Sequence, residues 1–192
     1  MDGTRQRLIE AATQLLDEGG PAAVTLREVG RLAGVSHNAP YKHFADKEDL
    51  LAAVAAGQLG RQRRRRTGAT ATEDGIERLR TLMGGYVRWA LRHPARFKLT
   101  YGSWSTDSAE LAEAAGSARQ ELVEAVSAAQ EAGDLPAGDP ERLAALVHAT
   151  AHGAVDLALS GHLSKSGKGH ADPEDLVSDL LRHLHPPAAG RR

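Results

Sequence analysis

The stretch 36–44, Ser-His-Asn-Ala-Pro-Tyr-Lys-His-Phe, concentrates side chains that can bind nucleic acid. The amide of Asn38 can make two hydrogen bonds to adenine, and the imidazole of His37 can donate to a base or a phosphate. Lysine binds phosphate, which suits Lys42 and also Lys47, where the start of the next predicted helix adds positive potential. These residue types predict contact with a polyanion such as double-stranded DNA.

A tight turn precedes this stretch. Gly34 can take a positive φ without a Cβ clash, and Val35 is placed to fill the angle between two short helices. Ser36 is expected to cap the second of these helices and to offer its hydroxyl to a phosphate. A short helix, a glycine turn and a polar second helix form a helix-turn-helix, whose second helix lies in the DNA major groove.

The two aromatic residues of the stretch have two interpretations. Aromatics at helical spacing usually fill cores, so Tyr41 and Phe44 can pack the helix against Leu26, Val29 and Leu50. We expect this of Phe44. Tyr41 can combine a packed ring with a hydroxyl that contacts phosphate.

Apolar residues recur at helical spacing along the chain, and no window alternates like a strand. The first helix ends at Gly19-Gly20-Pro21, and Thr25 and Asp46 are expected to cap the second and fourth helices. The prediction is an all-α chain of about nine helices. Three helices form an N-terminal helix-turn-helix domain (residues 1–50), and a connecting helix joins it to a helical bundle for ligand binding and dimerisation (residues 51–192).

Composition excludes several classes of protein. The 192 residues include 24 Lys+Arg, 25 Asp+Glu and no cysteine, so disulfide scaffolds, thiolate metal sites and cysteine nucleophiles are excluded. We expect a cytoplasmic protein, because no secretory signal and no membrane-spanning apolar run is evident. Residues 1–66 hold 11 Lys+Arg against 8 Asp+Glu, so a polyanion is expected to meet this part.

The N-terminal residues resemble the DNA-binding domain of the tetracycline-repressor (TetR) family over roughly residues 4–55. The resemblance is carried by Thr25-Leu26-Arg27-Glu28-Val29, Ala33-Gly34-Val35-Ser36, Tyr41-Lys42-His43-Phe44 and Lys47-Glu48-Asp49-Leu50-Leu51. It implies a dimeric repressor, released from its operator by a small-molecule effector. With the residue chemistry above, it gives the predicted DNA-binding set: Thr25, Arg27, Ser36, His37, Asn38, Ala39, Tyr41, Lys42, His43 and Lys47. Many members carry glycine at the position of Asn38, which leaves the base preference open.

The C-terminal part resembles a TetR subgroup whose C-terminal domain carries a Trp-His-Gly triplet, although Ala151 replaces the tryptophan here. Its aromatic residues are either core or the wall of an apolar pocket. His148, His152 and Asp156 recur every four residues, which suits polar ligand anchors, interface residues, a metal site or an enzyme. We predict no metal, no cofactor and no catalytic residue. The predicted ligand-binding set is Tyr86, Trp89, Phe97, Tyr101, Trp104, His148, His152 and Asp156.

An arginine run, Arg61 and Arg63 to Arg66, has two interpretations. It can grip phosphates, as in a protein that coats DNA without sequence preference. Arg63 lies 16 residues after Lys47, however, which is about 24 Å along a helix from the end expected to meet DNA. We therefore favour a cationic helix C-terminus that is stabilised by the helix dipole.

The last two helices are predicted to form a homodimer interface. One short recognition helix contacts few base pairs, so two half-sites are needed for useful specificity. The predicted interface residues are small or branched on one helix and apolar on the other: Ala144, Val147, Ala151, Ala154, Val155 and Ala158, then Leu176, Val177, Leu180, Leu181 and Leu184. A ligand in the bundle is expected to move the fourth helix and so change the separation of the two DNA-binding domains.

Overall fold

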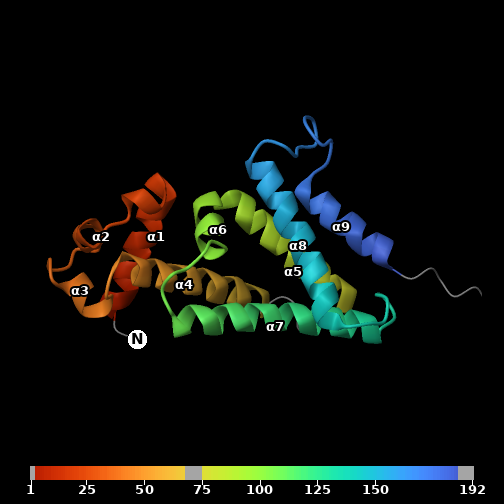
Figure 1. Ribbon diagram of the computed structural model, residues 1–192, viewed down its shortest axis with the longest axis horizontal. Helices are drawn as coiled ribbons and strands as arrows, with labels where there is room; N and C mark the ends of the chain where they lie inside the picture. The colour runs from red at the N-terminus through yellow and green to blue at the C-terminus, as the bar shows by residue number, and fades with distance from the viewer. Residues whose placement is uncertain (1–2, 68–74, 186–192) are drawn as a thin grey trace, which may run out of the picture. The chain divides into compact units, whose positions relative to one another are not determined.

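The computed structural model of the chain describes residues 3–67 and 75–185, except for the side chains of residues 62–67. The described residues form nine helices and no strand, as predicted (Figure 1). They divide into two compact units. We call residues 1–62 with 93–117 the head unit and residues 63–92 with 118–192 the body unit. The head unit therefore includes the segment 93–117, which lies beyond residue 50; the domain boundary there stays a prediction.

The head unit begins with α1 (Gly3–Ala23), α2 (Leu26–Leu32), α3 (Ala39–His43) and the first part of α4 (Lys47–Thr67). Its second segment holds α6 (Pro94–Thr100), which packs on α1, and the start of α7 (Ala109–Glu131). The predicted stop in α1 is confirmed as a kink, because Gly20 takes a φ of 67° just before Pro21.

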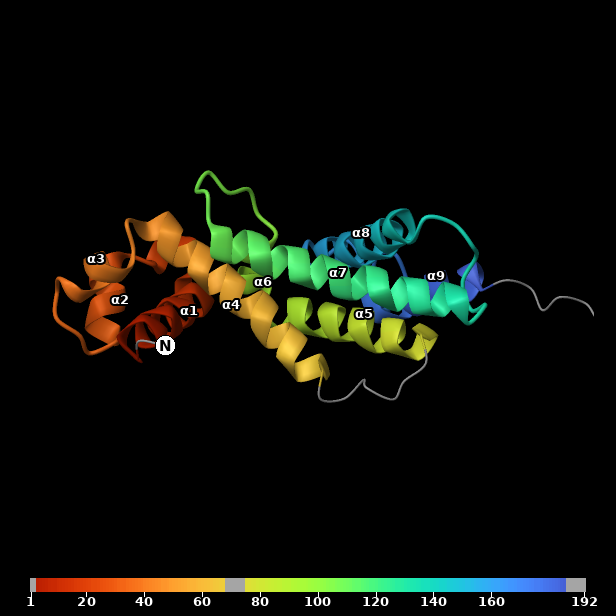
Figure 2. The same ribbon diagram turned by 90° about the horizontal axis from the view of Figure 1, so that it is seen from below.

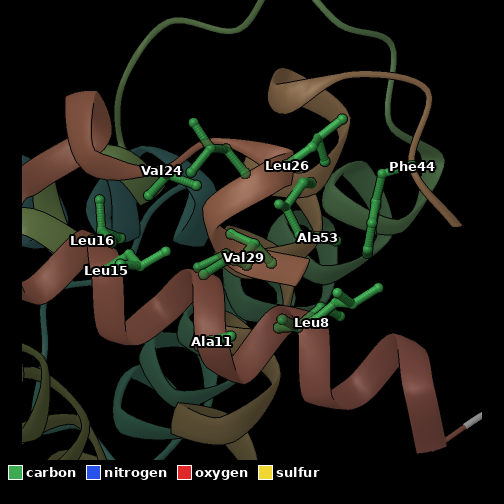
Figure 3. Close-up of a cluster of buried hydrophobic side chains, with 14 residues drawn as sticks. Leu8, Ala11, Leu15, Leu16, Val24, Leu26, Val29, Phe44 and Ala53 are labelled. Carbon is green, nitrogen blue, oxygen red and sulfur yellow. The ribbon is translucent and has the colours of Figure 1, made fainter. Parts of the chain in front are cut away.

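One apolar core holds the head helices together (Figure 3). Leu8 and Leu16 on α1 and Val29 on α2 are fully buried, and Phe44, after α3, is 2% exposed. The expected packing role of Phe44 is confirmed. Because short helices are marginal alone, α2 and α3 depend on this core for their stability.

Polar caps fix where the head helices begin. Thr25 Oγ1 accepts from the Glu28 N–H at 3.2 Å, and Asp46 Oδ1 accepts from the Asp49 N–H at 2.9 Å, so both predicted caps are confirmed. The predicted cap at Ser36 is wrong. Residues 36–38 form a turn, in which the Ala39 N–H bonds to the Ser36 carbonyl at 2.9 Å, and α3 begins at Ala39. Pro40 at the helix start favours this later beginning.

The body unit contains α5 (Gly75–Arg92), α8 (Pro140–Leu159), α9 (Pro173–Leu184) and the second part of α7. Helices α5, α8 and α9 pack against one another (Figure 2). Asp139 and Asp172 cap α8 and α9 by accepting backbone N–H bonds at 2.9 and 2.8 Å. At the start of α5, a Cβ on Gly75 would clash with the backbone nitrogen of Ala129 on α7, so only glycine fits this approach.

Candidate nucleic-acid interface

The turn between α2 and α3 is closed by its own backbone. Gly34 has a φ of 64°, its N–H bonds to the Arg31 carbonyl at 3.2 Å, and the Val35 N–H bonds to the Gly30 carbonyl at 3.1 Å. This pair of bonds is the Schellman motif, in which glycine supplies the left-handed residue. The predicted role of Gly34 is confirmed, and the motif sets the direction in which the chain leaves α2.

A second glycine, which the sequence analysis did not single out, brings the two helices close together. Gly30 is buried on α2, and a Cβ there would lie 2.9 Å from Cγ of Pro40 on α3. The proline ring is rigid, so it cannot move aside as a flexible side chain would. The distance between α2 and α3 therefore depends on the absence of a side chain at residue 30.

The predicted DNA-binding residues lie on the start of α2, the turn, α3 and the start of α4. Seven are exposed: Thr25, Arg27, Ser36, His37, Asn38, Tyr41 and Lys42. Three are half-buried: Ala39, His43 and Lys47. None of the ten is in the core, and α3 lies at one end of the group formed by α1, α2 and α3 (Figure 1). A polar helix in this position is available to a DNA groove.

Tyr41 lies outside the head core. This residue is 54% exposed, and the centroid of its ring lies 6.1 Å from that of the His37 ring. Of its two interpretations, the one in which the ring packs into the head core does not hold, and the exposed side chain can bring its hydroxyl to a phosphate.

Three side-chain links tie segment 93–117 to the head helices. Arg96 binds the Asp17 carboxylate at 2.8 and 2.5 Å. Arg5 binds Glu110 at 2.5 Å and lies 5.3 Å over the Phe44 ring. The links join residues 79 and 105 positions apart, so local sequence patterns could not predict them.

The third link holds the loop before α7 to the first turn of α4. Ser105 donates its backbone N–H and its hydroxyl to the Glu48 carboxylate at 2.7 and 2.5 Å. These donors lower the pKa of Glu48, since hydrogen bonds favour its charged form. Glu48 therefore stays ionised beside Lys47, within the predicted DNA-binding set.

The five aromatic residues of the predicted ligand-binding set are divided between the two units. Phe97 and Tyr101 lie in the head unit with ring centroids 5.6 Å apart, and Trp104 packs against the head core. Tyr86 and Trp89 are buried in the body unit. The five aromatic residues thus form two groups, one in each unit, rather than a single cluster.

In the body unit, Tyr86 meets both predicted histidines. Its hydroxyl is 2.9 Å from Nδ1 of His152, and its ring lies 5.3 Å from that of His148. Burial, and secondarily the charge of His152, lower the pKa of His148. Asp156 is exposed, and no group of three metal-binding side chains was found among the described residues. A tyrosine and two histidines can exchange hydrogen bonds with a polar ligand.

His148 makes the stability of the body unit depend on pH. The unfolded chain binds a proton at His148 at a higher pH than the folded chain does, so stability rises with pH across that interval. We expect stability to fall as the pH drops below about 6.5, the ordinary value for histidine, and His148→Gln to reduce this fall. Urea unfolding between pH 5 and 8 measures it, with the exposed His162 changed to Gln as control. An equal effect of both variants would contradict the assignment.

The α8 residues predicted to form the dimer interface pack inside the body unit instead. Ala144, Val147, Ala151, Ala154 and Val155 are buried within this chain, and Ala158 is half-buried. On the opposite face, Leu146 and Leu157 are each 47% exposed. Ala149 and Gly153 lie between them in sequence, and the repeat 146, 149, 153, 157 could have revealed this face. On α9, Val177 and Leu181 are buried, while Leu176, Leu180 and Leu184 are half-buried.

For Arg63–Arg66 of the arginine run, the structure describes the backbone alone. The predicted separation of about 24 Å between Lys47 and Arg63 assumed one continuous helix, and α4 does continue to Thr67. The side chains of Arg63–Arg66 lie outside the described residues. Separately, none of the described helices is long and apolar enough to cross a membrane.

Two family models match the chain. Residues 8–54 match that of the bacterial regulatory proteins of the tetR family, and residues 79–184 match the tetracyclin repressor-like C-terminal domain. The second match alone covers more than half of the chain. The matches include every residue of the predicted DNA-binding set and all eight of the predicted ligand-binding set.

Among the proteins similar to this chain, two are named as transcriptional regulators. The HTH-type transcriptional repressor Rv3405c of Mycobacterium tuberculosis is 34% identical over 88 residues, which are 41% of this chain and 46% of that protein. The HTH-type transcriptional regulator BetI of Rhizobium meliloti is 39% identical over 59 residues, 31% of this chain and 29% of that protein. The chain thus matches less than half the length of these relatives.

Solved structures are similar over nearly the whole chain. A protein of unknown function from Rhodococcus sp. RHA1 is 32% identical, with a TM-score of 0.80 and 97% of each chain covered. FadR from Bacillus subtilis, solved with stearoyl-CoA, is 17% identical, with a TM-score of 0.68 and 94% of this chain and 97% of that one covered. The second likeness concerns the fold alone.

Proposed function

Since the chain belongs to the tetR family of bacterial regulatory proteins, we propose that it is a transcriptional repressor that binds an operator in double-stranded DNA through α3. The family consists of transcription factors, not enzymes. The observation that carries the proposal is the exposed polar surface formed by residues 36–38 and by Tyr41 and Lys42 of α3. The Gly34 turn and the close approach of α2 to α3 at Gly30 position this surface. A helix so placed fits the major groove.

The side chains divide by chemistry into two roles. Asn38 and His37, both exposed in the turn before α3, are assigned to base edges, where an amide and an imidazole can distinguish base pairs. Lys42, Lys47 and the hydroxyl of Tyr41 are assigned to phosphates, which fix the position of the protein on the duplex.

The test is a mobility-shift assay with DNA from the intergenic region beside the coding sequence. Specific binding at physiological salt, with random duplex bound at least about a thousandfold more weakly, would support a sequence-specific regulator. Equal affinity for both duplexes would instead support a protein that coats DNA. No binding even at low salt would overturn the proposal.

Lys47 provides a sharper measure of phosphate contact. Lys47→Ala should weaken operator binding by about fivefold at physiological salt and reduce the slope of log K against log salt by about 0.9 per protomer, because one phosphate neutralisation is lost. The exposed Lys168→Ala in the body unit is the matched control and should change neither quantity. An unchanged slope in the Lys47 variant would contradict its role.

We also propose a homodimer that buries the exposed apolar face of α8 with the half-buried leucines of α9. The double variant Leu146→Glu and Leu157→Glu should weaken dimerisation at least about a hundredfold, because like charges would face each other across the two-fold axis. Sedimentation equilibrium measures this, and Ala115→Glu on the exposed face of α7 serves as control. A dimer that survives the double change would place the interface elsewhere.

The proposed effector site in the body unit is centred on Tyr86, His148 and His152. Their hydrogen-bonding groups stand among buried apolar side chains of α5 and α8, which is the usual composition of a small-molecule site. A bound effector would shift α4, whose residues belong to both units, and change the spacing of the two recognition helices.

A further inference from the structure

A cleft of about 580 Å³ opens in the head unit, apart from the Tyr86 and histidine group. It is lined by the end of α1, the first turns of α4, and the end of α6 with the loop that follows it. Its volume suits a small organic molecule. Neither the predicted ligand-binding set nor the proposed effector site includes this cleft as a whole.

One side of the cleft is apolar. Leu51 of α4 is buried, and Leu99 and Trp104 are partly buried and pack against the head core. A leucine and an indole ring that are still partly exposed in a cleft offer apolar surface to a ligand. The cleft therefore favours an occupant with an apolar body.

The two carboxylates at the cleft each accept hydrogen bonds from the protein. Asp46 accepts the Asp49 N–H at 2.9 Å, and Glu48 accepts both donors of Ser105. The hydrogen bonds from Ser105 keep Glu48 ionised. Neither carboxylate forms a close ion pair with a cation among the described residues.

The cations at the cleft have no such partner. Lys47 and Lys98 line it, and neither forms an ion pair with any side chain that the structure describes. The indole N–H of Trp104 is shielded from solvent and also lacks an acceptor among the described residues. Two ammonium groups without an ion-pair partner thus border an apolar surface, and an anion is the ligand that both can bind.

We propose that this cleft binds a small organic anion with an apolar body, a carboxylate carried on an aryl or alkyl group. The ammonium groups of Lys47 and Lys98 bind the carboxylate. Leu51, Leu99 and Trp104 contact the apolar body.

Binding there opposes binding to DNA, a step that rests on the proposed function of Lys47 as a phosphate contact. An ammonium group engaged by the ligand carboxylate is less available to a phosphate. A saturating ligand should therefore lower operator affinity by about the fivefold that one phosphate contact contributes. The link of Glu48 to Ser105 joins the cleft loop to the same turn of α4.

The first experiment measures binding without DNA. Trp89→Phe leaves Trp104 as the only tryptophan, so its fluorescence reports on the cleft. We expect 4-phenylbutyrate to change this fluorescence with a Kd on the order of 1 mM or lower, and the uncharged 4-phenylbutan-1-ol to bind more weakly. Equal affinity for acid and alcohol, or no change with either, overturns the proposal.

Matched variants then locate the anion. Lys98→Gln should weaken 4-phenylbutyrate binding by about three- to fivefold, as expected of a partly exposed ion pair, and Lys98→Arg should restore it. The exposed Lys168→Gln in the body unit is the control. If the Lys98 and Lys168 variants bind alike, the assignment is wrong.

The DNA arm separates the two proposals. In mobility-shift assays, 4-phenylbutyrate should weaken operator binding by the wild type and have less effect on Lys98→Gln, whose binding without ligand is unchanged because Lys98 is outside the DNA-binding set. Ligand binding by a protein that fails to bind DNA would overturn the proposed function and leave the anion site standing. Operator binding with no response to bound ligand would overturn only the coupling.

Discussion

Gly30→Ala should reduce operator affinity by roughly 10- to 100-fold, the equivalent of one or two lost base contacts. The new methyl group would lie 2.9 Å from the Pro40 ring, and neither the ring nor the buried backbone of α2 can yield without displacing α3. Displacement of α3 moves Asn38 and Tyr41 together, since Tyr41 is on this short helix and Asn38 directly precedes it. A mobility-shift titration at fixed salt measures the loss.

The control for this variant is Gly116→Ala on α7, where a Cβ would meet nothing within 4 Å. Alanine there should leave operator binding unchanged and raise stability by about 0.5–1 kcal/mol, because glycine is a poor helix former. Thermal unfolding of both variants separates loss of position from loss of fold. Wild-type affinity in a folded Gly30→Ala protein would show that the approach of α2 to α3 does not position the recognition helix.

Phe97→Ala should destabilise the head unit by about 3–5 kcal/mol, the usual cost of removing a buried aromatic ring. Phe97 is 2% exposed on α6 and is among the largest fully buried side chains. For a chain of this length the loss corresponds to a fall in Tm of roughly 6–20 °C. Differential scanning calorimetry or circular dichroism would measure it.

This variant also decides between the two interpretations of Phe97. As a core residue, it should tolerate Phe97→Leu at a cost below about 1.5 kcal/mol, because most of the volume is kept. If instead it lines a ligand pocket, the alanine variant should retain a Tm near that of the wild type and lose effector binding. Its burial against the helices of the head favours the first outcome.

The parts of the head that the sequence predicted are those governed by near neighbours in the chain. Thr25 and Asp46 cap their helices through residues three positions away, and Gly34 takes the left-handed conformation its turn requires. The prediction that Ser36 caps α3 was wrong because a serine followed by a polar segment is compatible with either a helix start or a turn. Pro40 moved the start of α3 by setting φ inside the segment.

Features set by distant residues were beyond such an analysis. Apolar spacing on α8 predicted an amphipathic helix, but it did not show whether the small-residue face packs within the chain or against a second copy. Likewise the aromatic cluster in sequence was separated in space, because Tyr86 and Phe97 belong to different units. The three links from segment 93–117 join residues that are at least 57 positions apart in the sequence.

Those links have a practical consequence for domain exchange. A chimera that joins residues 1–50 of this chain to the C-terminal part of another regulator would carry Asp17 and Glu48 without Arg96 and Ser105, and Arg5 without Glu110. A transplantable module must therefore combine two pieces of sequence, with residues 93–117 moved together with the N-terminal helices. Exchange at a single junction would transfer the DNA-recognition residues without part of the scaffold that supports them.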